Sequence, residues 1–554
     1  MQGPPDATPL SVAHDLDAIV RRLADPAVAR VDLVRAPGST LGLLVAALAR
    51  KAGAPPVLVV TADTDEARRI AADVAFFGGS PEGEEAAEEG RGEILLLPAT
   101  ESSPYAEVAP DRRAAMARLA TLFHLSQGLP WRVLIAPATA LARRVIPRAA
   151  LSPRCDLVQA EELVDRDALI RGLVEGGYLR VPVVEDPGTF AVRGAVLDLW
   201  PPSSRWPARV ELDDDLCLSI KLFDPEGQRT VRTVRELFVH PAREALVGDA
   251  ERARAKQRVR DLIDAVEMPS NHAVKLLDDV DSGRAFLGAE GFLPAYYPAL
   301  EAVTDYLPPG ATVLWHRPTE ALAALRAELE RADADFAARM DKRLPSFPVA
   351  AHYLDEGAVM AALGGRRVAV VHDVAVRGAE AEGSVEALEF VPPEAEVLDV
   401  GGETLARLAA DIKAVRSERG KADALVPLVE QVQYWWREGY RVFLAGRTPT
   451  QAERLATLAR GHGLDVRMHP GAFRWDLLHA EHRPETPVVE VVTGELTRGL
   501  ALPSRLVAVV TEEEVFGARA RRTARRSSGK GDARPFLDDL RAKGCAQGFD
   551  ILLG

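Results

Sequence analysis

Short apolar runs alternate with amphipathic segments over the first 150 residues of the chain. Val31–Val34 and Val57–Val60 have the length and the β-branched content of buried strands. Leu41–Lys51 and the segment after the second strand carry apolar residues at helical spacing. The helix in the later segment is expected to begin at Asp63 or Thr64 as its N-cap. Strands that alternate with helices predict βαβ units on a mostly parallel sheet.

The pattern changes between about residues 151 and 242, where strand-like runs follow one another closely. Their turns are rich in Pro, Gly and Asp, as in Pro201–Ser203 and Asp213–Asp215. Closely spaced strands with such turns predict an α+β insert built on an antiparallel sheet. The expected strands are Phe190–Leu199, Ala208–Leu212, Leu216–Phe223 and Glu236–His240.

Alternation of helices and strands returns after residue 242 and begins again near Gly401. The sequence therefore predicts a multidomain α/β protein whose first parallel domain is interrupted by the insert and is followed by a second, smaller and separate α/β domain. The predicted segments are 1–150, 151–242, 243–398, 399–517 and a basic linker and tail over 518–554.

Composition indicates a globular cytoplasmic protein. The chain has 554 residues, with 68 Lys and Arg against 82 Asp and Glu, which gives a formal net charge of −14. This length predicts about three to five domains, and an acidic balance disfavours a dedicated nucleic-acid coat. Cys155, Cys217 and Cys545 are too far apart for a disulfide framework or a CxxC metal site. Neither a signal peptide nor a membrane span is expected.

The turn after the first strand has the position of a phosphate-binding loop but not its chemistry. Its glycines and hydroxyls are Gly38, Ser39, Thr40 and Gly42, and no lysine occurs before Lys51. A working loop needs that lysine, because it neutralises the charge of the nucleotide phosphates. We therefore expect a degenerate nucleotide loop without ATP hydrolysis, in which Ser39 or Thr40 is only a helix N-cap.

Other polar clusters are expected to be structural. Thr511–Glu514 follows an apolar strand, and its carboxylates complement the dipole of a helix that starts there. His469, His479 and His482 lie in a charged stretch that predicts a solvated surface and no metal site. The acidic residues of Ser80–Gly92 predict a solvated loop, and the Trp435–Trp436 pair is expected to fill a core.

Several motifs in and around the insert carry a specific resemblance. Gly177–Val181, Val184–Pro201, Ala208–Glu211 and Ser219–Arg229 together resemble the second domain of bacterial transcription-repair coupling factors (Mfd), in the module that this family shares with the excision-repair protein UvrB. Similar motifs continue on both sides, and residues 400–517 are similar to the third domain of the same family. The flanking motifs are Leu97–Tyr105, Arg118–Leu122, Phe292–Tyr297 and Asp305–Pro308.

The resemblance implies a partner-binding surface on the insert. In the family this surface binds UvrA, and Arg193, Arg209 and Glu211 match positions that UvrB uses in that contact. Arg180 and Phe190 are further nominees from the same surface by motif position. Strand alternation supports the first three, because Arg193 is expected to share a face with Ala191 and Ala195, and Arg209 and Glu211 to share a face of the next strand. Ordinary surface charges on the solvent side of the sheet are the alternative interpretation. The UvrB pattern has another Arg where this chain has Ala191.

The resemblance also implies what this chain does not do alone. The first domain is expected to be a degenerate relative of a helicase fold, and Ser102–Pro110 is too short for the aromatic hairpin with which UvrB clamps damaged DNA. In the family, an RNA-polymerase-interacting domain and an ATP- and Mg-dependent DNA translocase follow residue 541. Residues 543–554 match nothing expected there, so a fragment, a split gene and a frame break all remain open. No cofactor is expected in this chain, and RNA polymerase and DNA are expected to bind the domains that it lacks.

The expected function is recruitment of UvrA in transcription-coupled nucleotide excision repair of damaged DNA, by a chain that is not itself an enzyme. One alternative is a UvrB-like, nucleic-acid-stimulated ATPase or helicase that acts alone. Another is a DNA-binding arm formed by the basic residues between 519 and 530, whose binding is expected to weaken steeply with salt.

Overall fold

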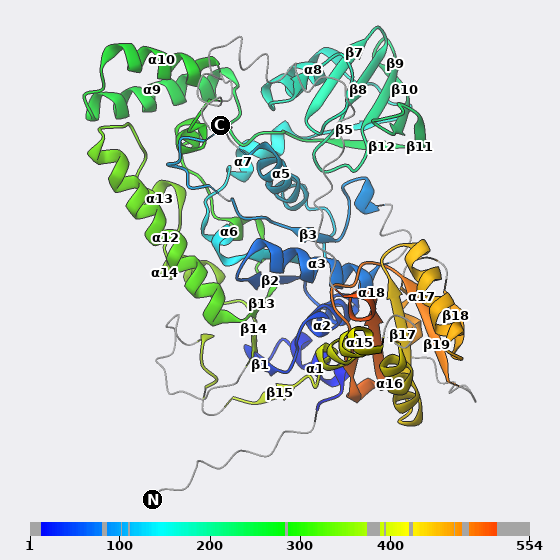
Figure 1. Ribbon diagram of the computed structural model, residues 1–554. Helices are drawn as coiled ribbons and strands as arrows, with labels where there is room; N and C mark the ends of the chain where they lie inside the picture. The colour runs from blue at the N-terminus through cyan, green and yellow to red at the C-terminus, as the bar shows by residue number, and fades with distance from the viewer. Residues whose placement is uncertain are drawn as a thin grey trace, which may run out of the picture. The chain divides into compact units, whose positions relative to one another are not determined.

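A computed structural model describes residues 13–79, 86–100, 102–108, 111–282, 286–373, 388–392, 395–419, 425–469, 471, 473–478 and 487–517. The basic stretch 519–530, the tail 543–554, His479 and His482 lie outside the described residues. Figure 1 shows the ribbon with the labels used below.

The first domain is built on a seven-stranded sheet with the order β15-β1-β14-β13-β2-β4-β3. Each pair of neighbouring strands in this sheet is parallel. Strands from both sides of the insert interleave, so residues before 150 and after 243 complete one sheet. The strands are β1 (Arg30–Val34), β2 (Val57–Thr61), β3 (Ile94–Leu96), β4 (Val133–Pro137), β13 (Thr312–His316), β14 (Val368–His372) and β15 (Val397–Asp399).

Both faces of this sheet are buried. Along β2, Val57 and Val59 belong to one apolar core and Leu58 and Val60 to another, as the two-residue period of a strand requires. Helices α1 (Leu16–Ala24), α2 (Ser39–Arg50) and α3 (Thr64–Gly78) supply the first core. The second core receives residues from α5 (Arg112–Ser126), α6 (Ala138–Ala142), α9 (Asp249–Ala265), α10 (Ser270–Ser282), α12 (Pro318–Asp341) and α14 (Glu356–Leu363).

The insert contains a six-stranded sheet with the order β11-β10-β9-β8-β7-β6 and a two-stranded β12-β5 ladder. The expected strand Phe190–Leu199 is in fact a hairpin, because the chain reverses at Gly194 and Ala195 so that Arg193 pairs with Val196. Gly194 has φ +58°, which glycine adopts without strain at the first position of a two-residue turn. The elements are β5 (Asp156–Gln159), α8 (Arg166–Glu175), β6 (Leu179–Arg180), β7 (Thr189–Arg193), β8 (Val196–Leu199), β9 (Ala208–Asp213), β10 (Leu216–Phe223), β11 (Thr230–Val234) and β12 (Glu236–Val239).

The third sheet has six strands in the order β16-β20-β21-β17-β19-β18, which confirms a second α/β domain. This domain is not separate from the first, because its residues Phe443, Leu500 and Val509 belong to the same apolar core as α2. The elements are β16 (Glu403–Thr404), α15 (Ala406–Arg419), α16 (Val426–Arg437), β17 (Arg441–Gly446), α17 (Pro449–Gly461), β18 (Asp465–Met468), β19 (Val488–Thr493), β20 (Leu500–Leu502), β21 (Val507–Thr511) and α18 (Glu512–Phe516).

Part of the acidic segment before β3 contacts the insert instead of forming a free solvated loop. Residues 80–85 lie outside the described residues, but Glu88 lies 2.6 Å from Arg205 and Glu89 lies 3.0 Å from Arg232. The backbone N–H of Arg205 also donates to the carbonyl of Glu88 at 2.8 Å. The described part of this segment therefore attaches the insert to the first domain, contrary to the expectation from its composition.

None of the helices within the described ranges combines the length and the apolarity that crossing a bilayer requires.

A buried polar pair lies inside the parallel sheet. Asp32 of β1 lies 2.8 Å from Nε2 of His372 on β14, and it also accepts hydrogen bonds from Arg30. Burial alone would raise the pKa of the Asp32 carboxyl above its usual 3.8, but the hydrogen bonds from His372 and Arg30 outweigh burial and lower the pKa.

Replacing Asp32 by Ala is expected to destabilise the first sheet by about 3–5 kcal/mol, because His372 and Arg30 lose a buried partner. The measurement is native-state hydrogen exchange of the β1 and β14 amides. The exposed Glu330 of α12 is the control, since its replacement by Ala should change stability by less than about 0.5 kcal/mol. The folded-state pKa of Asp32 lies below the unfolded value of 3.8, so its contribution is present above pH 3.8 and is lost as the pH falls further.

Candidate functional site

The solvent-facing side of the insert sheet carries a charged network centred on Asp198. Asp198 lies opposite Ala191 on β7 and opposite Arg209 on β9, and its side chain is fully buried. It accepts hydrogen bonds from Arg209 Nε at 2.7 Å and Nη2 at 2.9 Å. Arg193 also donates to Asp198 from Nη2. One buried carboxylate therefore holds two guanidinium groups in place.

The two arginines differ in how much of the side chain they offer to solvent. The Arg193 side chain is 49% exposed, whereas that of Arg209 is 25% exposed. The Arg209 guanidinium lies 4.8 Å from the centre of the Phe223 ring, and Asp198 raises its pKa through the hydrogen bond. Arg209 is thus fixed against the sheet, and Arg193 is the more accessible of the two.

A second charged group lies next to the first on the same face. Glu211 of β9 accepts hydrogen bonds from Lys221 Nζ at 2.7 Å and from Ser219 Oγ at 2.7 Å. These bonds, with the Lys221 bond as the larger cause, lower the pKa of the Glu211 carboxyl. Arg193, Arg209 and Glu211, which were predicted as a set, are therefore together on one face, and each is anchored by a neighbour.

Exposed leucines lie at one end of this face. Leu216 of β10 pairs with Asp213 of β9 and bridges to Leu163. Leu163 is 80% exposed and Leu218, next to the register shift in β10, is 52% exposed. Alternation along β10 places Leu216 on the face opposite the buried Cys217, so the charged centre is continued by apolar side chains.

Two of the predicted partner-binding residues are not on this face. Phe190 is fully buried in the core of the insert, together with Leu197 and Val210, and its nomination as a surface residue is wrong. Arg180 is exposed, but its register partner in the parallel β6–β7 pair is Phe190, so it lies on the opposite side of the sheet from Arg193.

Sequence reasoning missed the residues that organise the face. Asp198 lies in the apolar run Val196–Trp200, where an Asp is unusual and signals a buried partner for nearby cations. Lys221 lies between the apolar Ile220 and Leu222, a local pattern that indicates the solvent-facing side of the strand, and the register then places it opposite Arg209. Ala195 belongs to the turn and not to the face, and Ala191 is buried among Val184, Trp200 and Phe223.

The degenerate nucleotide loop is not an open site. The N-cap of α2 is Gly38, with φ +53°, and neither Ser39 nor Thr40 caps the helix, contrary to expectation. Both lie within the first turn and are buried. The Ser39 hydroxyl instead accepts a hydrogen bond from the backbone N–H of Arg498 at 3.2 Å. The loop has no lysine, and the segment that contains Arg498 lies against it, so it does not fit a nucleotide phosphate.

The remaining polar candidates have structural roles. Nε2 of His469 lies 2.7 Å from Glu490, and Glu514 at the start of α18 accepts a hydrogen bond from the backbone N–H of Thr511 at 2.9 Å. Within the part of the chain that the structure describes, no group of three or more His, Cys, Asp or Glu residues could hold a metal ion. Trp435 is buried, as predicted for a core residue.

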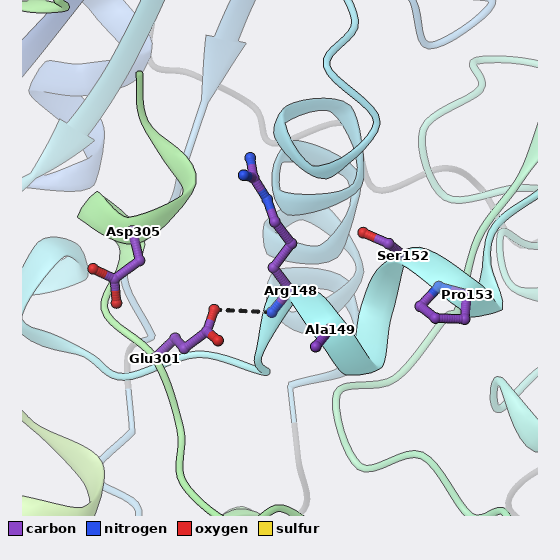
Figure 2. A pocket seen from close by; sticks show the side chains of 6 residues that line it. All are labelled: Arg148, Ala149, Ser152, Pro153, Glu301 and Asp305. Atoms are coloured by element: carbon purple, nitrogen blue, oxygen red, sulfur yellow. Dashed lines mark hydrogen bonds between the residues drawn. The ribbon is translucent and has the colours of Figure 1, made fainter. Parts of the chain in front are cut away.

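A depression of about 490 Å³ between α7 (Arg148–Leu151) and the segment around Glu301 is lined by polar groups that already have partners. Figure 2 shows the Arg148 guanidinium pointing away from Glu301, and it donates to the carbonyls of Leu125 and Tyr306. Glu301 accepts from the backbone N–H of Arg148 at 2.9 Å, and Asp305 accepts from that of Ala302 at 2.9 Å. This depression therefore offers little to a ligand.

Comparisons with known proteins agree with the resemblance of the motifs. Residues 157–244 match the UvrB interaction domain. A transcription-repair-coupling factor of Myxococcus xanthus is 34% identical over 532 residues, which are 92% of this chain and 42% of that protein. Those of Bacillus subtilis and Escherichia coli are 23% identical over 505 residues and 28% identical over 310 residues. These two alignments cover 88% and 55% of this chain, and 38% and 25% of the relatives.

The chain spans less than half the length of these relatives. Over 92% of its residues it is homologous to a portion of the transcription-repair-coupling factors, so the predicted resemblance is confirmed. The charged face lies wholly within the matched UvrB interaction domain.

Replacing Phe190 by Ala is expected to destabilise the insert by about 3–5 kcal/mol, because it leaves a cavity in a closed core. Hydrogen exchange of the β7, β8 and β9 amides measures this change. Replacement of Arg180 by Ala is the control and should alter stability by less than about 0.5 kcal/mol. A Phe190 variant that keeps full protection of these strands would contradict the core position.

Proposed function

We propose that this chain, a homologue of part of the bacterial transcription-repair-coupling factors, recruits a UvrA-type protein through the solvent-facing side of its insert sheet and so acts in transcription-coupled nucleotide excision repair. The observation that carries the proposal is the clamping of Arg193 and Arg209 by the buried carboxylate of Asp198. A clamped guanidinium loses little conformational entropy on binding, so such a pair is suited to directional contacts with a partner.

The chemistry of the face indicates what the partner surface must offer. Arg193 bonds to Asp198 through Nη2, and its side chain is half exposed, so the rest of the guanidinium is available to a carboxylate of the partner. Cations outnumber carboxylates among Arg193, Arg209, Lys221, Asp198 and Glu211. A partner with acidic residues opposite this centre, and with an apolar rim opposite the exposed leucines, fits both features.

The homology supports the same assignment. The matched family is described as a UvrB interaction domain, and the relatives are named transcription-repair-coupling factors. The alternative of an ATPase that acts alone has no comparable support, because the loop at Gly38–Gly42 lacks a lysine and lies against Arg498.

Replacing Arg193 by Ala should weaken binding of purified UvrA by about 2–5 kcal/mol, because a desolvated carboxylate of the partner loses its donor. Isothermal titration calorimetry with the complete chain measures the affinity. Arg180 replaced by Ala is the matched control, since it removes an exposed arginine from the opposite side of the same sheet. Micromolar or tighter binding that is unchanged by the Arg193 substitution would contradict the assignment of this face as the UvrA-binding site.

Asp198 tests pre-organisation separately from direct contact. Replacing Asp198 by Ala should weaken UvrA binding about tenfold or more, because both guanidinium groups lose the bonds that hold them and two clamped side chains become free to move. The same calorimetric titration applies, with hydrogen exchange of the β8 and β9 amides to establish that the sheet remains folded. An Asp198 variant that is folded and binds with unchanged affinity would show that the clamp is not needed.

A further inference from the structure

The segment between β19 and β20 lies against the start of α2, where a working nucleotide loop would hold phosphates. The backbone N–H of Arg498 donates to Ser39 Oγ at 3.2 Å, and Thr497 Oγ1 lies 3.4 Å from the same hydroxyl. These contacts join residues that are 459 and 458 positions apart in the chain. Figure 1 shows α2 (blue) next to the second α/β domain, which contains the third sheet and is called the third domain below (yellow to red).

Asp73 of α3 binds the same segment more strongly. Its carboxylate accepts hydrogen bonds from the backbone N–H of Thr497 at 2.8 Å and from Thr497 Oγ1 at 2.8 Å. The Asp73 side chain lies in a buried position, with the residue 2% exposed. A buried carboxylate is costly unless it is hydrogen-bonded, so these contacts specify where Thr497 must lie.

Three glycines allow the close approach on which this contact depends. A Cβ at Gly42 would collide with Asp73, so α2 and α3 approach closely only because residue 42 is glycine. A Cβ at Gly402 would lie 2.5 Å from Thr40, and one at Gly494 would lie 2.7 Å from the Phe76 ring. The first and third domains therefore fit closely where Gly402 meets Thr40 and where Gly494 meets Phe76.

Apolar contacts surround the polar centre. Phe473 of the third domain stacks on Phe76 with ring centroids 5.0 Å apart, and it meets Phe77 edge-on at 5.6 Å. Phe443 also meets Phe473, with ring centroids 5.6 Å apart. Aromatic burial supplies affinity without fixing a register, whereas the Asp73 and Ser39 hydrogen bonds are directional.

We infer that the degenerate nucleotide loop is a docking site for the chain's own third domain, in which Thr497 and Arg498 occupy the position that nucleotide phosphates take in a working loop and Asp73 and Ser39 fix their register. The third domain is then held to the domain that carries the insert, and the loop has a binding function although it lacks the lysine of a working loop. This inference does not rest on the proposed recruitment of UvrA.

The docking contact is expected to respond to pH. Burial raises the pKa of Asp73 to about 6, and the hydrogen bonds from Thr497 only partly oppose this effect. The nearby charged groups are Arg69 on α3, which lowers the pKa, and Glu495 and Arg498 on the docked segment, of which Glu495 is paired with Arg447. The folded chain, with Asp73 buried, takes up a proton between the usual pKa of 3.8 and about 6, so this buried arrangement should gain stability as the pH falls from about 6 toward 4.

Hydrogen exchange of the complete chain, followed by mass spectrometry, tests the inference. Replacing Thr497 by Val removes the hydroxyl and keeps the shape, and Asp73 replaced by Ala removes the acceptor. Protection of the α2 and β20 amides should fall about tenfold to a hundredfold in both variants, because a buried hydrogen bond to a charged group is lost. Protection of the β7, β8 and β9 amides in the insert should stay unchanged.

Two further variants complete the experiment. Asp73 replaced by Asn keeps an acceptor for the Thr497 N–H, so it should retain most of the protection and lose the pH dependence. Thr457 on α17 bonds only within its own helix to the Glu453 carbonyl, and its replacement by Val is the matched control. Unchanged protection in the Thr497 and Asp73→Ala variants would overturn the inference. A loss that spreads equally to the insert in the Thr497 variant would also overturn it, because the contact would then support folding in general and not docking.

Discussion

Burial of α2 on every side is the constraint on which the arrangement of the two α/β domains depends. All residues from Ser39 to Leu48 are buried, because the first sheet, α1, α3 and the third domain share one apolar core with this helix. An amphipathic helix would leave a polar face to solvent, but α2 has none over these residues. The third domain therefore completes the core of the first, and its removal would expose much of α2 to water. The same packing places Thr497 and Arg498 at the start of the helix. The contacts of the degenerate nucleotide loop therefore follow from the core that the two domains share.

The insert follows a different rule. Its core around Phe190, Leu197 and Val210 receives Met116 of α5 from the first domain. Glu88, Glu89 and the bond from Arg112 to the carbonyl of Gly188 also attach the insert to that domain. Its solvent-facing side is therefore free to be specialised. Asp198 illustrates the principle, since a fully buried carboxylate in a sheet is tolerated only because two guanidinium groups bond to it, and these in turn become rigid elements of the surface. The two arginines make the burial of this carboxylate possible, and their fixed guanidinium groups also suit directional recognition.

Prediction from sequence succeeded where the signal was local. The strand expected over Val57–Val60 is β2, which is one residue longer, and Asp63 caps α3 through the N–H of Glu66 as expected. It failed where a motif or a continuous apolar pattern obscured a local signal, and where the partner of a residue lies across the fold. Phe190 lies in a motif that resembles a binding surface, yet alternation along β7 turns it into the core. The Gly194–Ala195 turn escaped notice because a two-residue reversal leaves the apolar pattern on either side nearly continuous. Ser39 has the residue type of an N-cap, but its hydroxyl bonds to the third domain.

The sequence by itself determined the fold class, the alternation of helices and strands in the two α/β domains, the family resemblance and the three charged residues of the insert that share a face. These follow from residue periods of two and 3.6 and from motifs whose members lie close together in the chain. Only the tertiary structure decided that Asp198 binds both arginines, that Phe190 is internal, and that the degenerate loop receives the third domain. Asp73 and Thr497 are separated by 424 positions, and the sequence around either residue carries no signal that predicts their contact. A buried carboxylate finds its donor through the packing of whole domains, and that packing is a property of the folded chain.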